Sequence, residues 1–223
     1  MMNINIEIIM ALFLLSCLLL AASSRMLHCI RIVILQGILL GVLPLFLASE
    51  IHSEQYVAAA LNIIIKAVAL PLLLRLAMRR ANVKRELEPL VGYPFSLLIV
   101  LCGIGVAFML SSQLTFPAVA GESLRLVLPV SFSVMLTGLF IVMARKKAIT
   151  QAIGFLTFEN GIALFGNGMM IECGLAVELG ILLDVFVLVF VMGIAVMRIN
   201  RAFEHIDSDK LVLLGETSGG TEK

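Results

Sequence analysis

The chain has 223 residues, of which 61% are hydrophobic and only 14% are charged, and its mean hydropathy is +1.11. These values lie far outside the range of soluble globular domains and predict an integral membrane protein. The formal net charge is +1. The sequence has no basic patch with interleaved aromatic residues, so nucleic acid is not an expected partner.

The four cysteines are widely scattered and form neither a C-x-x-C pair nor a metal-ligand spacing. The sequence also lacks a glycine-rich phosphate loop and a nucleophile elbow. We therefore expect no metal, iron–sulfur cluster, cofactor or required disulfide in this chain. Because the loops between the apolar segments are short, we also expect that the chain is not an enzyme by itself.

Long apolar segments run through most of the chain. A transmembrane helix needs about 20 mostly apolar residues to cross a hydrocarbon core of about 30 Å. By this criterion the sequence predicts an all-α membrane protein with about seven transmembrane helices. The predicted spans cover residues 4–22, 30–48, 56–78, 95–113, 122–143, 149–170 and 174–197.

The charges between these spans predict the orientation. Fourteen of the 16 lysines and arginines would lie on one side of the membrane, and the other two are Arg125, near the opposite surface, and Lys66, within the third span. Connections on the opposite side carry glutamates and almost no cations. By the positive-inside rule the basic side is the cytoplasm. We therefore expect a multi-pass protein of the cell inner membrane with its N-terminus outside and its C-terminus cytoplasmic.

Three ionisable side chains lie near the middle of predicted spans, namely Lys66 in the third, Glu159 in the sixth and Asp184 in the seventh. A charge at the bilayer centre costs roughly 3 to over 10 kcal/mol, so such residues face a partner or a water-filled path. Groups of this kind at one depth can exchange protons. The alternative is a buried ion pair that only fixes helix packing. The sequence leaves open whether Lys66 pairs with Glu159 or with Asp184.

Two further features concern the last two spans. Glu178 lies nearer the outer surface than Asp184 and is a candidate exit group, with an interfacial carboxylate that reaches water as the alternative. The sixth span carries a stripe of small residues, which lets helix backbones approach closely. Glu159 points away from this stripe, so we expect one helix face to pack tightly and another to present the carboxylate. The stripe consists of Thr150, Gly154, Thr157, Gly161 and Gly168.

The last three spans resemble the small K-type subunit of respiratory complex I and the related C subunit of multi-subunit cation/proton antiporters. Those proteins have three spans, a basic cytoplasmic turn after the first and a membrane glutamate in each of the other two. Here the basic turn is Arg145-Lys146-Lys147. Aligned without gaps, Glu159 lies about one turn after the position of the first glutamate, and Asp184 lies close to the position of the second.

With its N-terminal extension, the chain resembles component E of hydrogenase-4, a membrane subunit of formate hydrogenlyase-type [NiFe] hydrogenases. This resemblance implies an extension of about four helices in residues 1–121, a K-like module of three helices in residues 122–201 and a cytoplasmic tail in residues 202–223. It also implies other membrane subunits, of antiporter-like and anchor type, and a peripheral hydrogenase arm as partners. That arm, and not this chain, would hold the NiFe and iron–sulfur centres.

The sequence therefore predicts a non-catalytic membrane subunit of a proton-translocating hydrogenase complex. Glu159, Asp184, Lys66 and Glu178 are the candidate residues of its ion path. Two alternatives are a subunit of a multi-subunit cation/proton antiporter and a purely structural membrane anchor. The sequence does not distinguish H⁺ from Na⁺, and it indicates neither the direction nor the stoichiometry of translocation, nor the electron donor.

Overall fold

The computed structural model describes residues 2–47, 64–69, 72, 74–75, 91–113, 122–145 and 147–168. In these residues the regular structure is entirely helical. The elements are α1 (Met2–Ala22), α2 (Met26–Leu47), the π-helix η1 (Ile64–Ala69), α5 (Tyr93–Gln113), α6 (Glu122–Ala144) and α7 (Ala148–Gly168). The expected all-α class is thus confirmed for the described part of the chain.

Four helices, α1, α2, α5 and α6, are long and apolar enough to cross a membrane. Their ends differ from those of the predicted spans by at most four residues. The helix α7 is as long as α1 but less apolar, because Gln151, Glu159 and Asn160 interrupt its apolar sequence. A membrane protein is therefore confirmed at the level of these four helices, whereas the seventh span at residues 174–197 and the tail lie outside the described residues.

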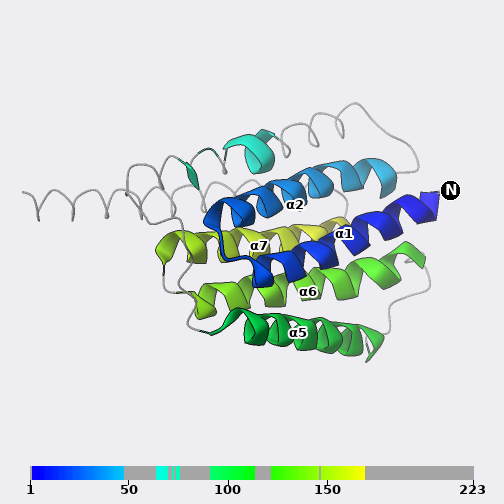
Figure 1. Ribbon diagram of the computed structural model, residues 1–223. Helices are drawn as coiled ribbons and strands as arrows, with labels where there is room; N and C mark the ends of the chain where they lie inside the picture. Colours follow the sequence, from blue (N-terminus) through cyan, green and yellow to red (C-terminus); the bar gives the residue numbers. More distant parts are fainter. Residues whose placement is uncertain are drawn as a thin grey trace, which may run out of the picture.

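The helices lie side by side as a bundle, with short turns between α1 and α2 and between α6 and α7 (Figure 1). In this bundle α6 contacts α7, α5 and α1, while α2 contacts α1, α7 and η1. The two short turns place the end of α1 and the start of α2 at the same end of the bundle as the junction of α6 and α7. This end carries the exposed Arg25 and the partly exposed Lys147.

The small-residue stripe of α7 packs against α6, as the sequence predicts. A Cβ atom added to Gly154 would lie 2.8 Å from the backbone nitrogen of Val142, and one added to Gly161 would lie 2.7 Å from that of Met135. A Cβ atom on Gly138 of α6 would meet the backbone of α7. Glycine is therefore needed at these positions for the backbones to approach this closely.

Buried apolar side chains form two clusters along the bundle. The basic-end cluster lies beside the two short turns and includes Leu20, Met26, Ile30, Ile141 and Ile153. The opposite-end cluster includes Met10, Phe13, Leu40, Val130 and Leu164.

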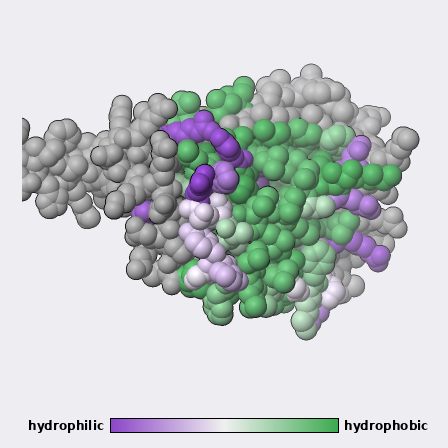
Figure 2. All heavy atoms as spheres, in the orientation of Figure 1, coloured by the Kyte–Doolittle hydropathy of each residue, from purple (hydrophilic) through white to green (hydrophobic). Residues whose placement is uncertain are grey.

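The outer surface is also apolar. Figure 2 shows hydrophobic side chains across the middle of one face and hydrophilic ones near its two ends. The helix α5 contributes strongly, because Phe95, Leu98, Leu101 and Met109 are each more than half exposed. Such a surface would be an aggregation hazard in water and is the normal surface of a helix that faces lipid.

Candidate functional site

A layer of buried polar side chains lies between the two apolar clusters. In α2, Gln36 lies between Val33 of the basic-end cluster and Leu40 of the opposite-end cluster. In α7, Glu159 and Asn160 hold the corresponding position. The polar layer is therefore near the middle of helices of 21 and 22 residues, at the level where a bilayer would be driest.

The centre of this layer is an ion pair between Lys66 and Glu159. The Nζ atom of Lys66 lies 2.9 Å from Oε1 of Glu159, although the two residues are 93 positions apart in the chain. Their side chains are only 4% and 1% exposed. The structure thus brings together two of the three residues that the sequence places near the middle of their spans, and Glu159 is a partner of Lys66.

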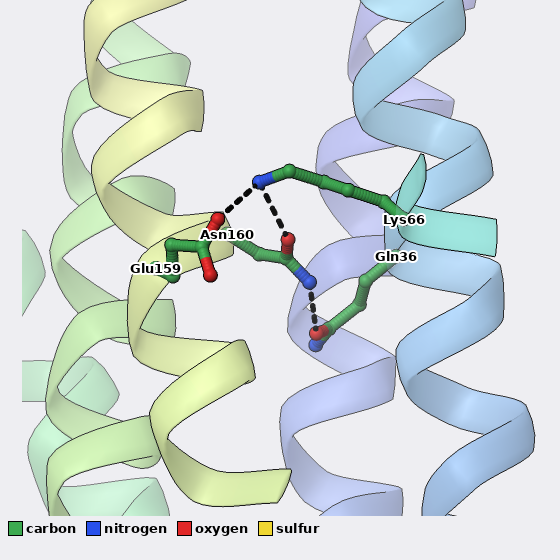
Figure 3. A network of polar contacts seen from close by, with 4 residues as sticks. All are labelled: Gln36, Lys66, Glu159 and Asn160. Carbon is green, nitrogen blue, oxygen red and sulfur yellow. Dashed lines mark hydrogen bonds and ion pairs between the residues drawn. The ribbon is translucent and has the colours of Figure 1, made fainter. Parts of the chain in front are cut away.

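Two amide side chains extend the pair into α2, as Figure 3 shows. Lys66 Nζ also donates to Oδ1 of Asn160 at 3.3 Å, and Asn160 Nδ2 donates to Oε1 of Gln36 at 3.3 Å. Gln36 Nε2 in turn donates to the hydroxyl of Ser16 in α1 at 2.8 Å, and that hydroxyl donates to the Phe13 carbonyl oxygen at 2.6 Å. We call Ser16, Gln36, Asn160, Lys66 and Glu159 the polar network.

Close backbone contact positions Lys66 against α2. A Cβ atom added to Gly37 would lie 3.0 Å from Lys66 Cβ and 3.3 Å from the Lys66 carbonyl oxygen. Glycine at this position therefore lets η1 lie directly on α2, next to Gln36. The π-helical turn widens the helix around Lys66, and such turns often occur at functional sites.

Glycine packing also determines where Glu159 points. The stripe of α7 faces α6, and Glu159, on a different face of α7, reaches Lys66 of η1. The neighbouring Asn160 contacts both Lys66 and α2. The helix α7 thus uses one face for packing and another for the charged layer, as the sequence predicts.

A second buried cation lies at the basic end of the bundle. Arg145 is only 2% exposed, its Nη2 donates to the Ala21 carbonyl oxygen at 3.4 Å, and its guanidinium lies 5.4 Å from the Tyr93 ring centroid. Burial lowers the pKa of Arg145 below its ordinary value, opposed by attraction to Tyr93 and Cys29. Arginine stays charged under such a shift. The sequence grouped Arg145 with the loop cations, whereas the structure shows it buried between the ends of α1, α5 and α6.

The structure tests the site predictions unequally. Lys66 and Glu159 come together, whereas Asp184 and Glu178 lie outside the described residues. Sequence reasoning did not assign Gln36, Ser16 or Asn160 to the site. The signal for Gln36 was available, because it is an isolated amide in the middle of an otherwise apolar segment, where an unpaired polar group is costly.

Comparison with known proteins gives one relative. No protein-family model matches the chain, and no solved structure matches it. Over 184 residues the chain is 34% identical to the uncharacterized protein Rv0085 of Mycobacterium tuberculosis, and this match covers 82% of the chain and 83% of Rv0085. The chain belongs to the family of Rv0085. The name of Rv0085 assigns no activity, so it carries none over to this member of the Rv0085 family.

The polar network has a definite chemical capacity. An ammonium and a carboxylate at hydrogen-bonding distance can exchange a proton, giving an uncharged amine and an uncharged acid. Among the described residues, no group of three His, Cys, Asp or Glu side chains could hold a metal ion. The groups that the network brings together are thus suited to accepting and releasing protons.

Proposed function

We propose that this member of the Rv0085 family is a non-catalytic, multi-pass membrane subunit of a proton-translocating, membrane-bound hydrogenase complex of the formate hydrogenlyase type. Lys66 and Glu159 are its proton-exchanging pair. The observation that carries the proposal is their 2.9 Å contact, buried in the polar layer of a bundle of membrane-length helices.

Physical cost supports a functional reason for the pair. Each charge loses several kcal/mol of hydration on burial, and replacing a buried pair by apolar side chains is often neutral or stabilising. Ionisable groups within a membrane are accordingly concentrated in ion paths and proton relays. Hydrogen bonds through the side chains of Gln36 and Asn160 connect the polar network across α1, α2, η1 and α7.

The remaining parts of the proposal come from the sequence. Seven spans, an outer N-terminus and a cytoplasmic C-terminus follow from hydropathy and the distribution of cations in the inner membrane. Asp184 is the next acid of the path and Glu178 an exit group. The resemblance to component E of hydrogenase-4 supplies the complex, with a peripheral arm that holds the NiFe and iron–sulfur centres and with antiporter-like neighbours.

A structural anchor is the second candidate function. The observation that favours it is the close pairing of Lys66 with both Glu159 and Asn160, because a hydrogen-bonded buried pair can specify one helix arrangement. In that case the network fixes η1 against α2 and α7 and moves no ion. An antiporter subunit would share the ion path and lack the hydrogenase arm, so co-purifying [NiFe] and iron–sulfur subunits separate it from the main proposal.

The test uses the intact complex purified with Glu159→Gln, which keeps the size of the side chain and removes its charge. Hydrogenase turnover and ion uptake are measured in sealed vesicles. We expect assembly and hydrogen turnover to persist while coupled ion uptake falls at least tenfold. The matched control is Thr157→Val in the same helix, because Thr157 is also buried and its hydroxyl donates only to the backbone at 3.0 Å.

Each outcome has one meaning. Loss of ion uptake in Glu159→Gln with normal uptake in Thr157→Val supports a proton path through the pair. Wild-type uptake in both variants overturns that path and leaves the structural anchor. Uptake that depends on Glu159 in a complex without [NiFe] subunits replaces the hydrogenase with an antiporter.

A further inference from the structure

The hydrogen bonds that lead from Lys66 to α1 through the polar network all run in one direction. Lys66 donates to Asn160, Asn160 donates to Gln36, Gln36 donates to Ser16, and Ser16 donates to the Phe13 carbonyl oxygen. Asn160 therefore turns its oxygen toward Lys66 and its nitrogen toward Gln36 (Figure 3), and Gln36 turns its nitrogen toward Ser16 of α1. Hydrogen bonds aligned in this way polarise one another and strengthen along the chain.

This alignment distinguishes the two protonation states of lysine. The Asn160 oxygen directed at the amino group stabilises the positively charged ammonium much more than the neutral amine, because charge-assisted hydrogen bonds are roughly twice as strong as neutral ones. The network is nearly dry, with Gln36 at 0% and Asn160 at 3% exposure. Water therefore does little to screen this preference.

We propose that Asn160 and Gln36 are positioning residues that hold Lys66 as an ammonium against Glu159. Asn160 acts directly on the ammonium, and Gln36 acts through Asn160 by holding its amide in the orientation that presents oxygen to Lys66. Because both amides favour the charged amine, they keep the proton on Lys66 and the carboxylate on Glu159. The inference deepens the proposed function and rests on it for its biological meaning, but its test does not require ion movement.

The same chemistry limits where a proton can go. Primary amides neither bind nor release protons readily, so the two amides orient Lys66 without conducting its proton toward α1. The two amides therefore provide no route for a proton from Lys66 to α1. Gln36 and Asn160 thus end the proton-exchanging part of the network on the side that faces α2.

The test measures the protonation state of Glu159 in the purified full-length protein by infrared spectroscopy. The band of a protonated carboxyl group is assigned to Glu159 if it disappears when the same protein also carries Glu159→Gln. Wild-type protein at pH 7 is expected to show no such band. Asn160→Leu is expected to produce a clear Glu159 band, because the ammonium loses an acceptor, and Gln36→Met is expected to produce a weaker one.

Two further variants separate positioning from packing. Gln36→Glu retains an oxygen that accepts from Asn160 Nδ2. It is therefore expected to show no Glu159 band, as in the wild-type protein. Gln151→Met removes an amide from the other end of α7, where it donates to the Arg145 carbonyl oxygen at 3.0 Å, and is expected to leave Glu159 unchanged. If Asn160→Leu does not fold, the Gln36→Met spectrum tests the positioning role. This variant removes no hydrogen bond to Lys66, so any Glu159 band it produces must arise through Asn160.

The inference is overturned if Gln36→Met and the folded Asn160→Leu protein show no Glu159 band at pH 7, or if Gln151→Met produces the same band as they do. Its failure is distinguishable from failure of the proposed function. A Glu159 band in these variants without Glu159-dependent ion uptake preserves the positioning role and refutes the proton path. Ion uptake that depends on Glu159, together with unchanged spectra, supports the proton path and refutes the positioning role.

Discussion

Removing one partner of the buried ion pair should be more harmful than removing both. In Lys66→Met the carboxylate of Glu159 stays in a dry layer without its cation, and in Glu159→Gln the ammonium stays without its anion. The double variant Lys66→Met/Glu159→Gln leaves no charge at either of these two positions. Replacement of a whole buried pair is often neutral, whereas removal of one partner costs about 3–5 kcal/mol.

The magnitude can be worked from the structure. At 2.9 Å and an effective dielectric constant of about 20, the attraction between Lys66 and Glu159 is about 6 kcal/mol before hydration losses are subtracted. A buried charge that has lost its partner can become neutral by gaining or losing a proton. The free energy of that neutralisation is therefore an upper limit on the loss of stability. At pH 7, neutralising an ordinary glutamate costs about 4 kcal/mol and neutralising an ordinary lysine about 5 kcal/mol. We therefore expect losses of about 3–4 kcal/mol in Lys66→Met and about 3–5 kcal/mol in Glu159→Gln.

The two single variants should respond to pH in opposite ways. The cost of neutralising a carboxyl group falls as the pH falls, so the deficit of Lys66→Met relative to wild type should shrink between pH 7 and pH 5. The cost of neutralising an ammonium falls as the pH rises, so the deficit of Glu159→Gln should shrink toward pH 9. The double variant should show neither trend.

Thermal unfolding of the purified protein in one detergent, followed by circular dichroism, measures these differences. For a chain of this size, 1 kcal/mol corresponds to about 2–4 °C, so each single variant should lose roughly 10 °C and the double variant only a few degrees. Single variants within about 3 °C of wild type, or a double variant less stable than both, would refute the claim that the pair is buried and mutually dependent.

Two other predictions concern packing and are checked by the same unfolding measurement. Gly37→Ala and Gly154→Ala should each cost about 1–3 kcal/mol, because the added methyl group would meet backbone atoms at 3.2 and 2.8 Å; Gly105→Ala in α5, with nothing within 4 Å, is the control and should be neutral or slightly stabilising. Tyr93→Leu should cost about 1–2 kcal/mol through loss of the ring under Arg145, and an unchanged midpoint would show that this contact contributes nothing.

Local composition was sufficient to predict most of the helices. A run of about 20 apolar residues can satisfy its backbone hydrogen bonds in lipid only as a helix, so α1, α2, α5 and α6 follow from hydropathy almost residue by residue. The small-residue stripe of α7 likewise predicted close packing, because glycine spacing is a property of one segment. The depth of Lys66 and Glu159 followed from counting residues within their spans.

The partners across the bundle were decided only by tertiary structure. Hydropathy predicts where each helix lies along the membrane normal but not how it is rotated about its own axis. It therefore could not determine that Lys66 contacts Glu159, or that Asn160 of α7 and Gln36 of α2 join them. Burial of Arg145 was hidden for the same reason, since a cation at a helix end is equally compatible with water and with an aromatic ring. The sequence by itself predicted which residues lie near the middle of their spans. The packing of glycine faces determined which of them touch, because contact between segments 93 residues apart depends on how whole helices rotate against one another.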